Sequence, residues 1–308
     1  MPGGSLEVDR ISKRYGDLVA LEDLSLAVEP GQITGFVGPN GSGKTTAMRI
    51  IVGLLEADSG EVRWSGQPID SPTRRRIGYM PEERGLYPKM KVSDQLDYFG
   101  EIHGLDGATA SRRTLEWLER LGVADRAADN VEALSLGNQQ RVQLAASLVF
   151  EPEMLILDEP FSGLDPIGVD VLSGVLTEVC ETRGVPVIFS SHQLELVERL
   201  CDSVVIVKEG RLVASGTVEQ LERDNSDRLW LARVGGAPES WDPGLPGIEW
   251  RRPFIFRLDD EADPQALLRA AMDAGRVLEF GEHRPGLAEL FRSTIGESGG
   301  TREAGESR

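Results

Sequence analysis

An apolar run followed by a glycine-rich loop stands out near the start of the chain, where residues 33–46 read ITGFVGPNGSGKTT. The apolar residues 33–37 indicate a buried strand, and Gly38 to Thr45 complete the pattern G-x-x-x-x-G-K-[ST] ahead of a helix. Glycines allow such a loop to wrap a polyphosphate, so that backbone N–H groups and the helix N-terminus point at its oxygens. A glycine-rich turn that fits this pattern by accident is the alternative, and the strand-loop-helix context disfavours it.

The side chains of this loop predict a phosphate site. Lys44 would neutralise the β- and γ-phosphates of a nucleotide, and the hydroxyl of Thr45 would ligate Mg²⁺. The residues that we expect to bind the nucleotide are Gly38, Asn40, Gly41, Ser42, Gly43, Lys44, Thr45 and Thr46.

A second apolar run ends in two carboxylates. Residues 154–157 read MLIL, and Asp158 and Glu159 follow. In a doubly wound sheet, this strand end lies beside the phosphate loop. Asp158 then suits the coordination of Mg²⁺, and Glu159 suits a base that positions water against the γ-phosphate. Such a pair is often only the start of a solvated loop, but its position downstream of the phosphate loop favours chemistry.

Short β-branched runs alternate with helical stretches up to about residue 221, which predicts an α/β fold with crossover helices. Strand signals lapse at about residues 84–150, where apolar residues recur at helical spacing and residues 139–150 predict an amphipathic helix. We therefore expect a helical subdomain that interrupts the sheet. Strands are expected at residues 33–37, 77–80, 154–157, 185–190 and 203–207.

A change of composition after Asp224 predicts a domain boundary. Residues 1–224 would form the α/β domain, and residues 225–296, which are richer in Gly, Pro and Trp, a small α+β domain. The polar and Gly-rich residues 297–308 predict a disordered tail. In the small domain we expect a strand at residues 254–258, a helix at 264–274, a strand at 276–280 and a helix at 287–295.

Charge and composition argue against several classes of protein. The chain has 33 Lys and Arg against 51 Asp and Glu, a formal net charge of −18, which repels polyanions and argues against a nucleic-acid or ribosome binder. The two cysteines, Cys180 and Cys201, form no disulfide framework. The first residues hold no apolar targeting core, and the sequence lacks an uninterrupted apolar run of about 18 residues. We therefore expect a globular protein that does not itself span a membrane.

Four further motifs accompany the phosphate loop and the acidic strand in a fixed order. Residues 134–141 read LSLGNQQR, residues 162–165 read SGLD, and residues 190–192 read SSH after an expected strand. Tyr15 lies near the start, in the run KRYG. From about residue 6 to residue 221, these motifs resemble the nucleotide-binding subunit of an ABC transporter, with its signature sequence, D-loop, switch histidine and adenine-stacking aromatic.

The resemblance implies a P-loop ABC ATPase core that binds ATP and Mg²⁺ and works as a dimer. In that family the N-terminus of the signature helix faces the γ-phosphate held by the partner subunit, so that two ATP molecules are sandwiched. A plain helix N-cap, a core aromatic and a structural histidine are the alternatives for Ser135, Tyr15 and His192. The resemblance implies catalytic roles for Glu159, His192 and Lys44, adenine stacking on Tyr15, and contacts to the partner's nucleotide from Ser135, Gly137, Asn138 and Asp165.

Two places depart from the family's pattern. Glu82, in the run PEERGLYP, stands where the family usually has a glutamine, and it can reach Mg²⁺ or water but cannot donate a hydrogen bond. A similar loop is common in a subgroup of bacterial exporters. In the signature, Leu136 replaces a glycine and Asn138 replaces a glutamine, so Leu136 has to point away from phosphate while Gly137 keeps the close approach of the backbone.

The subgroup resemblance implies the ATP-hydrolysing subunit of an exporter of a drug, an antibiotic or an ion. It would sit at the cytoplasmic face of the cell membrane, held by separate integral-membrane permease subunits and paired as a homodimer or heterodimer. We expect Glu83 to Pro88 to line the groove for the permease, with an exposed patch around Leu86, Tyr87 and Met90. The C-terminal domain resembles that of many such exporters and would be either an inert prop or a regulator.

Two other functions are weighed against this one. A soluble ABC-type ATPase that acts on ribosomes or in DNA repair is disfavoured by the net charge of −18. A non-hydrolysing ATP sensor is disfavoured by the retention of Lys44, Asp158, Glu159 and His192.

Overall fold

The computed structural model describes residues 4–83, 85–224 and 228–283, together with residues 286, 287, 289 and 291. The chain forms two compact units, residues 1–217 and 218–308. The division comes before helix α8 (Val218–Asp224), whereas the change of composition comes after that helix.

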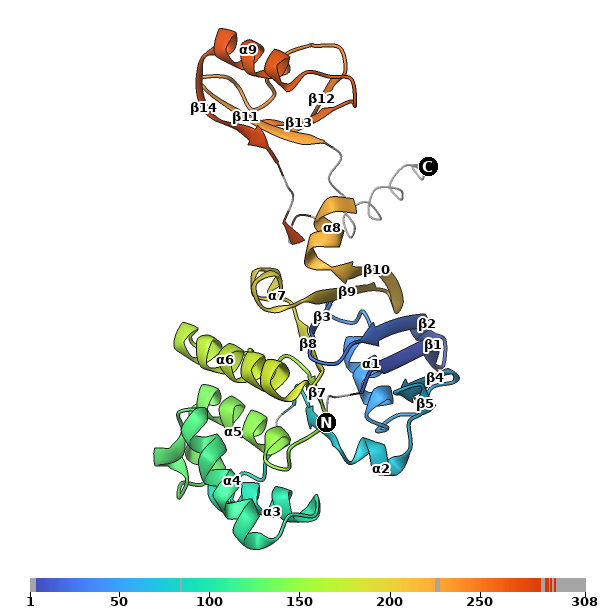
Figure 1. The fold of residues 1–308 in the computed structure, drawn as a ribbon, viewed down its shortest axis with the longest axis vertical. Coiled ribbons are helices and arrows are strands. Elements are labelled where there is room, and N and C mark those ends of the chain that lie inside the picture. The colour runs from blue at the N-terminus through green and yellow to red at the C-terminus, as the bar shows by residue number, and fades with distance from the viewer. Residues whose placement is uncertain are drawn as a thin grey trace, which may run out of the picture. The chain divides into compact units, whose positions relative to one another are not determined.

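A six-stranded sheet forms the centre of the first unit, in the strand order β10-β9-β3-β8-β7-β6 (Figure 1). Strands β3, β6, β7, β8 and β9 are parallel, and β10 pairs with β9 in the antiparallel direction. The expected strands are confirmed, with β8 beginning two residues later than its β-branched run. The bounds are β3 (Ile33–Val37), β6 (Ile77–Met80), β7 (Met154–Leu157), β8 (Val187–Ser191), β9 (Ser203–Lys208) and β10 (Arg211–Thr217).

A second, antiparallel sheet has the order β2-β1-β4-β5. Helix α1 (Lys44–Ile51) directly follows the glycine-rich loop, and its Met48 and Ile51 are fully buried in a core that also contains side chains of both sheets. This packing fixes the helix, and therefore the loop before it, against the sheets. The other elements are β1 (Leu6–Tyr15), β2 (Leu18–Val28), β4 (Ser59–Trp64), β5 (Gln67–Pro68) and α2 (Ser71–Arg74).

The region without strand signals is helical, as expected. It contains α3 (Val92–Ile102), α4 (Gly107–Arg120) and α5 (Leu136–Leu148), which lie together on one side of the sheet (Figure 1). Helix α5 begins earlier than the sequence pattern predicted, because Ser135 caps its N-terminus. Two short 3₁₀ turns, at residues 124–126 and 131–133, join α4 to α5, and α6 (Pro166–Arg183) and α7 (Leu194–Leu200) complete the unit.

Within the described residues, the second unit contains α8 and a four-stranded antiparallel sheet with a helix packed against it. Phe256 and Leu267 are fully buried in its core. The expected strand-helix-strand order is present, and the first two strands are additions to it. The predicted helix at 287–295 and tail at 297–308 lie mostly or wholly outside the described residues. The elements are β11 (Leu229–Gly235), β12 (Ile248–Arg252), β13 (Ile255–Leu258), α9 (Pro264–Ala274) and β14 (Arg276–Glu282), in the order β12-β13-β11-β14.

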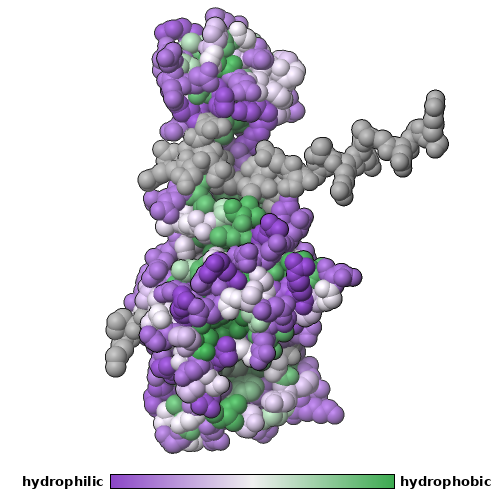
Figure 2. Space-filling model, turned by 90° about the vertical axis from the view of Figure 1, so that its right-hand side faces the viewer, coloured by the Kyte–Doolittle hydropathy of each residue, from purple (hydrophilic) through white to green (hydrophobic). Residues whose placement is uncertain are grey.

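Hydrophilic residues cover most of the described surface on the face in Figure 2, and hydrophobic residues form small separate areas. Within the described ranges, every helix is too short or too polar to span a bilayer.

Candidate nucleotide site

The glycine-rich loop turns tightly between β3 and α1, and two of its glycines cannot be replaced without a clash. Gly43 has a φ of 103°, and a Cβ atom there would lie 2.5 Å from the carbonyl oxygen of Ala20. At Gly38, a Cβ atom would lie 2.3 Å from the carbonyl oxygen of Val207. The glycines therefore let the loop pack against its neighbours while its backbone stays open toward the cavity beside it.

Lys44 is the first residue of α1, and its side chain turns back into the loop. Its Nζ donates to the carbonyl oxygens of Gly38, at 2.7 Å, and Pro39, at 3.2 Å. Burial lowers the pKa of Lys44, and the carboxylates of Glu159, Asp158 and Glu82 oppose that effect. The loop thus holds a buried cation at its centre, with acidic groups facing it.

The two carboxylates that follow β7 are tied to the next strand, β8, through one serine. The hydroxyl of Ser190 donates to Oδ1 of Asp158, at 2.6 Å, and accepts from the backbone N–H of Glu159, at 2.7 Å. The sequence analysis assigned Ser190 no role of its own, because the contact depends on the pairing of β7 with β8 in the folded sheet. Within the described part of the chain, Oδ2 of Asp158 and Oγ of Ser42 are buried without a hydrogen-bond partner. Both atoms are therefore free to bind a ligand.

Glu159 and His192 form a contact at the mouth of the site. Nδ1 of His192 lies 3.0 Å from Oε2 of Glu159, whose side chain is 13% exposed against 60% for His192. The backbone of Glu159 has a φ of 50°, in the left-handed region that non-glycine residues seldom adopt. Burial raises the pKa of Glu159, and His192 and Lys44 act against that effect. A carboxyl with a raised pKa next to a histidine is suited to accept or hold a proton.

Most of the residues that were expected to bind the nucleotide line one cavity of about 490 Å³. Its wall joins the glycine-rich loop to the ends of β1, β6 and β7. Three apolar residues at the start of β2, which sequence reasoning did not single out, also line it. The lining residues are Tyr15, Leu18, Val19, Ala20, Asn40, Gly41, Ser42, Gly43, Lys44, Thr45, Thr46, Glu82, Asp158 and Glu159.

The residues expected to contact a partner's nucleotide do not line this cavity. Ser135 is exposed at the N-terminus of α5, and its Oγ accepts from the N–H of Asn138 at 3.4 Å. Leu136 is 57% exposed. Asp165 caps α6 by accepting from the N–H of Gly168 at 2.8 Å. Gly137 lies in the first turn of α5, with its backbone only partly covered.

The segment after β6 differs in one respect from expectation. Leu86 is buried, with 8% of its surface exposed, whereas Tyr87 is 50% exposed. The amide of Gln95, on α3, binds both the N–H and the carbonyl of Tyr87, at 3.0 and 3.1 Å. That anchor turns Leu86 inward. The expected exposed patch is therefore wrong for Leu86, whereas Tyr87 is exposed as expected and Met90 is half-buried. Tyr98, on α3, is also exposed.

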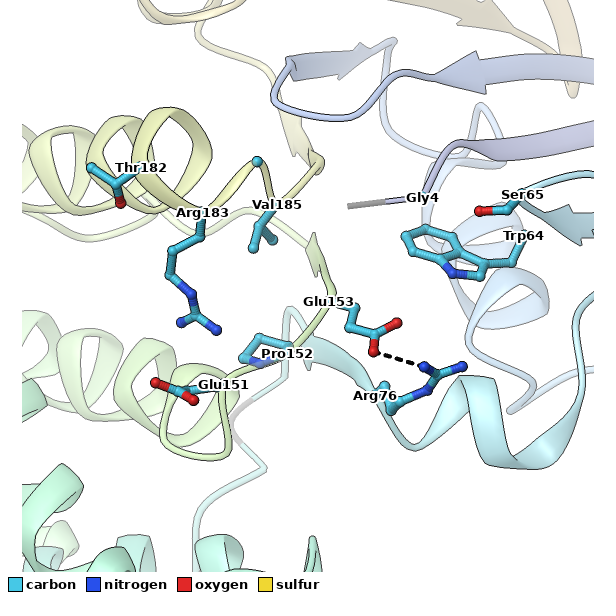
Figure 3. A pocket seen from close by; sticks show the side chains of 11 residues that line it. Gly4, Trp64, Ser65, Arg76, Glu151, Pro152, Glu153, Thr182, Arg183 and Val185 are labelled. Atoms are coloured by element: carbon cyan, nitrogen blue, oxygen red, sulfur yellow. Dashed lines mark hydrogen bonds and ion pairs between the residues drawn. The ribbon is translucent and has the colours of Figure 1, made fainter. Parts of the chain in front are cut away.

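A larger cavity, of about 960 Å³, lies at the amino ends of the parallel strands (Figure 3). Arg76, just before β6, and Glu153, just before β7, form an ion pair of 2.7 Å at its wall. The indole of Trp64 lines the same space. Ligands of open α/β sheets bind outside the carboxyl ends of the strands. The smaller cavity at the phosphate loop is therefore the stronger candidate site.

Comparisons with known proteins agree with this geometry. The family model described as ABC transporter matches residues 21–162. An uncharacterized ABC transporter ATP-binding protein, YhaQ of Bacillus subtilis, is 35% identical over 94% of this chain and 98% of its own length. The daunorubicin resistance ATP-binding protein DrrA3 of Streptomyces coeruleorubidus is 35% identical over 99% of this chain and 100% of its own length.

Solved structures lead to the same family. An ATP-binding subunit of an ABC transporter has a TM-score of 0.66 at 33% identity, covering 71% of this chain and 92% of that one. The dimeric bacterial ABC transporter cassette MJ0796 has a TM-score of 0.64 at 24% identity, covering 69% and 98%, and so shares the fold. The P-loop α/β core, the inserted helical region and these relatives lead to one conclusion: the chain belongs to the ATP-binding subunits of ABC transporters, whose cassettes hydrolyse ATP.

Proposed function

We propose that this subunit drives the export of a small molecule through a separate membrane permease, with two ATP molecules sandwiched between two cassettes. The observation that carries the proposal is the cavity in which Lys44, Asp158 and Glu159 converge on the glycine-rich loop. The printed functions of three relatives support export: daunorubicin resistance, linearmycin resistance and Nod factor export.

Within one chain, the roles follow from charge and position. Lys44 and the loop amides bind the β- and γ-phosphates, and Tyr15, 48% exposed at the cavity, stacks on the adenine. Glu159 holds the attacking water and takes its proton, while His192 orients that carboxylate and contacts the γ-phosphate.

The residues also fit a bound Mg²⁺. This ion commonly takes one or two protein ligands together with substrate phosphates, and the buried, unpartnered Oδ2 of Asp158 offers a carboxylate oxygen at this place. Thr45 and Glu82 line the same cavity. When bound, the ion would neutralise charge on the transferred phosphate. Asp158 would hold it, with its other oxygen anchored by Ser190.

The second half of the site would come from another copy or a related cassette. Ser135 and Leu136, at the N-terminus of α5, are exposed, and the first N–H groups and positive dipole end of a helix suit an anion. Its own chain's phosphate loop does not share a cavity with it. Ser135, Gly137 and Asn138 would therefore contact the γ-phosphate that a partner holds, with Asp165 at the dimer seam. The relative MJ0796 is a dimer.

The permease would bind near the loop that follows β6 and hold the subunit at the cytoplasmic face of the membrane. Tyr87 and Tyr98 supply exposed aromatic surface there, and aromatic residues are enriched at protein interfaces. Glu82 lies in the same loop and also lines the nucleotide cavity. It can therefore couple the state of the nucleotide to the membrane partner.

A transport assay in inverted membrane vesicles tests the proposal. We expect this chain, produced together with its permease, to drive ATP-dependent accumulation of the cargo inside the vesicles, which is the direction of export. Glu82→Ala should lower the stimulation of ATP hydrolysis by the permease, while Glu29→Ala, at an exposed position outside the cavity, should leave it unchanged. Failure of the chain to co-purify with the permease under ATP-trapping conditions would contradict the proposal.

A further inference from the structure

Helix α5 carries an amide side chain that binds the backbone of the loop after β7. Nε2 of Gln140 donates to the carbonyl oxygens of Glu159, at 3.1 Å, and Pro160, at 2.9 Å. The side chain of Gln140 is buried, with 7% of its surface exposed. An amide buried this deeply is costly unless its hydrogen bonds are made, so this contact fixes the two elements against each other.

The contact binds Glu159, which has the least favourable backbone conformation among the non-glycine residues of the site. Glu159 has a φ of 50°, and a non-glycine residue keeps that conformation only when its surroundings hold it. Its N–H is bound by Ser190 of β8, and its carbonyl is bound by Gln140 of α5. The N–H and the carbonyl of Glu159 are therefore both held, the first by β8 and the second by α5. Its carboxylate lies 3.0 Å from Nδ1 of His192.

The same helix makes a second contact of this kind three residues farther on. Nε2 of Gln143 donates to the carbonyl oxygen of Pro81, at 2.6 Å, next to Glu82. Gln140 and Gln143 are therefore on one face of α5, where residues three apart are neighbours. That face joins the helix to the loops of two carboxylates that line the nucleotide cavity, Glu82 and Glu159.

Ser135 is the N-cap of the helix that carries Gln140. The two positions are five residues apart in the chain, which amounts to about 7.5 Å along a helix axis. A helix is rigid over that distance. A displacement of the N-terminus of α5 therefore reaches Gln140 and, through it, the backbone of Glu159.

We propose that Gln140 is a positioning residue for hydrolysis: it holds Glu159 in its reactive conformation and makes that conformation depend on where α5 lies. This inference rests on the proposed role of Glu159 as the residue that activates water. In a nucleotide sandwich, a phosphate bound to the N-terminus of α5 of one copy would thereby act on the catalytic loop of that same copy. The two ATP sites of a dimer would be linked by a helix inside each chain.

The neighbouring glutamine provides a matched control. Gln139 is also buried, at 9% exposure, and its Nε2 also donates to two carbonyl oxygens, those of Val131 and Leu134. These two carbonyls precede α5 and lie outside the nucleotide cavity. Gln139→Met and Gln140→Met therefore remove equal numbers of hydrogen bonds at similar burial, and only the second releases Glu159.

Steady-state ATP hydrolysis by the full chain distinguishes the two variants. We expect Gln140→Met to lower kcat by about 10- to 100-fold, the loss typical of a misplaced catalytic group, with KM for ATP changed less than about twofold. Gln139→Met should keep kcat within about threefold of the wild type. Equal kcat values for the two variants, or an effect of Gln140→Met on KM alone, would overturn the inference.

A double-mutant cycle with His192→Ala adds a readout that a purely structural role would not move. If Gln140 acts through the Glu159–His192 contact, the loss in the double variant should fall clearly short of the product of the two single losses. Independent, multiplicative losses would contradict the inference. If Gln140→Met fails to fold, Gln140→Asn, which keeps the amide but shortens its reach, takes its place with the same expected loss of kcat.

The experiment separates this inference from the function on which it rests. If Glu159→Gln retains full turnover, the role of Glu159 itself is wrong. If Glu159→Gln loses turnover while Gln140→Met and Gln140→Asn keep it, only the role of Gln140 is wrong.

Discussion

The glycine-rich loop and the N-terminus of α5 are both suited to bind phosphate, yet they differ in how far their own chain completes them. Around the loop, Lys44 is buried and three carboxylates line one cavity. At the N-terminus of α5, Ser135 is exposed, and its Oγ accepts from the N–H of Asn138 within the same helix turn. The first region holds most of a phosphate site within its own chain, and we propose that the second completes a site on a partner.

This difference indicates what each region would do for the reaction. On this proposal, the loop would bind ATP and support its hydrolysis within one chain, whereas the end of α5 would gain a function when a second cassette brings it a nucleotide. Substitutions in the two regions should therefore fail in different ways. Those in the loop should weaken ATP binding or chemistry in a single chain, and those at Ser135 should act only between chains.

The largest effect is expected at Lys44. Lys44→Met removes the cation held by the carbonyl of Gly38 and should cost about 2–5 kcal/mol of ATP binding. Isothermal titration with ATP measures this loss. Lys89→Met, at an exposed lysine outside the cavity, serves as the control and should bind as the wild type does. Unchanged ATP affinity in Lys44→Met would show that the glycine-rich loop does not bind the nucleotide as proposed.

Glu159→Gln should separate chemistry from binding. The amide cannot accept the proton of water, so kcat should fall by roughly 10²- to 10⁴-fold, while ATP affinity stays close to that of the wild type. Phosphate release and nucleotide binding, measured on the same preparation, check both parts. Loss of binding together with turnover would show that Glu159 supports the cavity rather than the reaction.

Ser135 offers a way to separate capping from phosphate contact. Asp and Asn both cap helices well, so Ser135→Asp and Ser135→Asn should keep the melting temperature near that of the wild type. The aspartate would lie against the partner's γ-phosphate, where like charges cost several kcal/mol, so Ser135→Asp should lose hydrolysis and weaken dimer formation. Ser135→Asn should retain most of both. Equal activity of the two variants would leave Ser135 as a helix cap alone.

The smallest effect is expected in the pH dependence. Because burial raises the pKa of Glu159, and its carboxylate is the active form, kcat should fall on acidification at a pH above the ordinary range of a glutamate. The contact with His192 lowers that pKa. In His192→Ala the acidic limb of the kcat profile should therefore move to higher pH. A limb that stays in place or moves to lower pH would contradict the assigned contact.

The sequence was sufficient to predict the elements with strong periodicity or a complete motif. Strands β3, β6 and β7 appear with their expected bounds because they are largely apolar runs in a buried parallel sheet. In the second unit, β12 reads IEWRR, and only Ile248 of it is buried, so it carried no strand signal. The burial of Leu86 was missed because it depends on a distant contact. The amide of Gln95, on α3, binds the backbone of Tyr87, the residue after Leu86.

The candidate site shows the same limit. Motifs were enough to predict which side chains gather at the loop, since the ends of parallel strands meet at one edge of a sheet. The contacts that set the geometry come instead from Ser190 and Gln140, which lie within motifs but to which the sequence analysis assigned no role. Their partners are backbone groups that lie 31 and 19 positions away from them in the chain, so no local pattern indicates them.

A mixing experiment tests most directly whether the site is shared between chains. Ser135→Asp alone and Glu159→Gln alone should each be inactive. In a mixed dimer, one site combines the intact Glu159 of the first variant with the intact Ser135 of the second. An equal mixture should therefore recover up to about a quarter of wild-type ATP hydrolysis, because about half of the dimers are mixed and each has one intact site. A mixture no more active than its components would contradict the shared site.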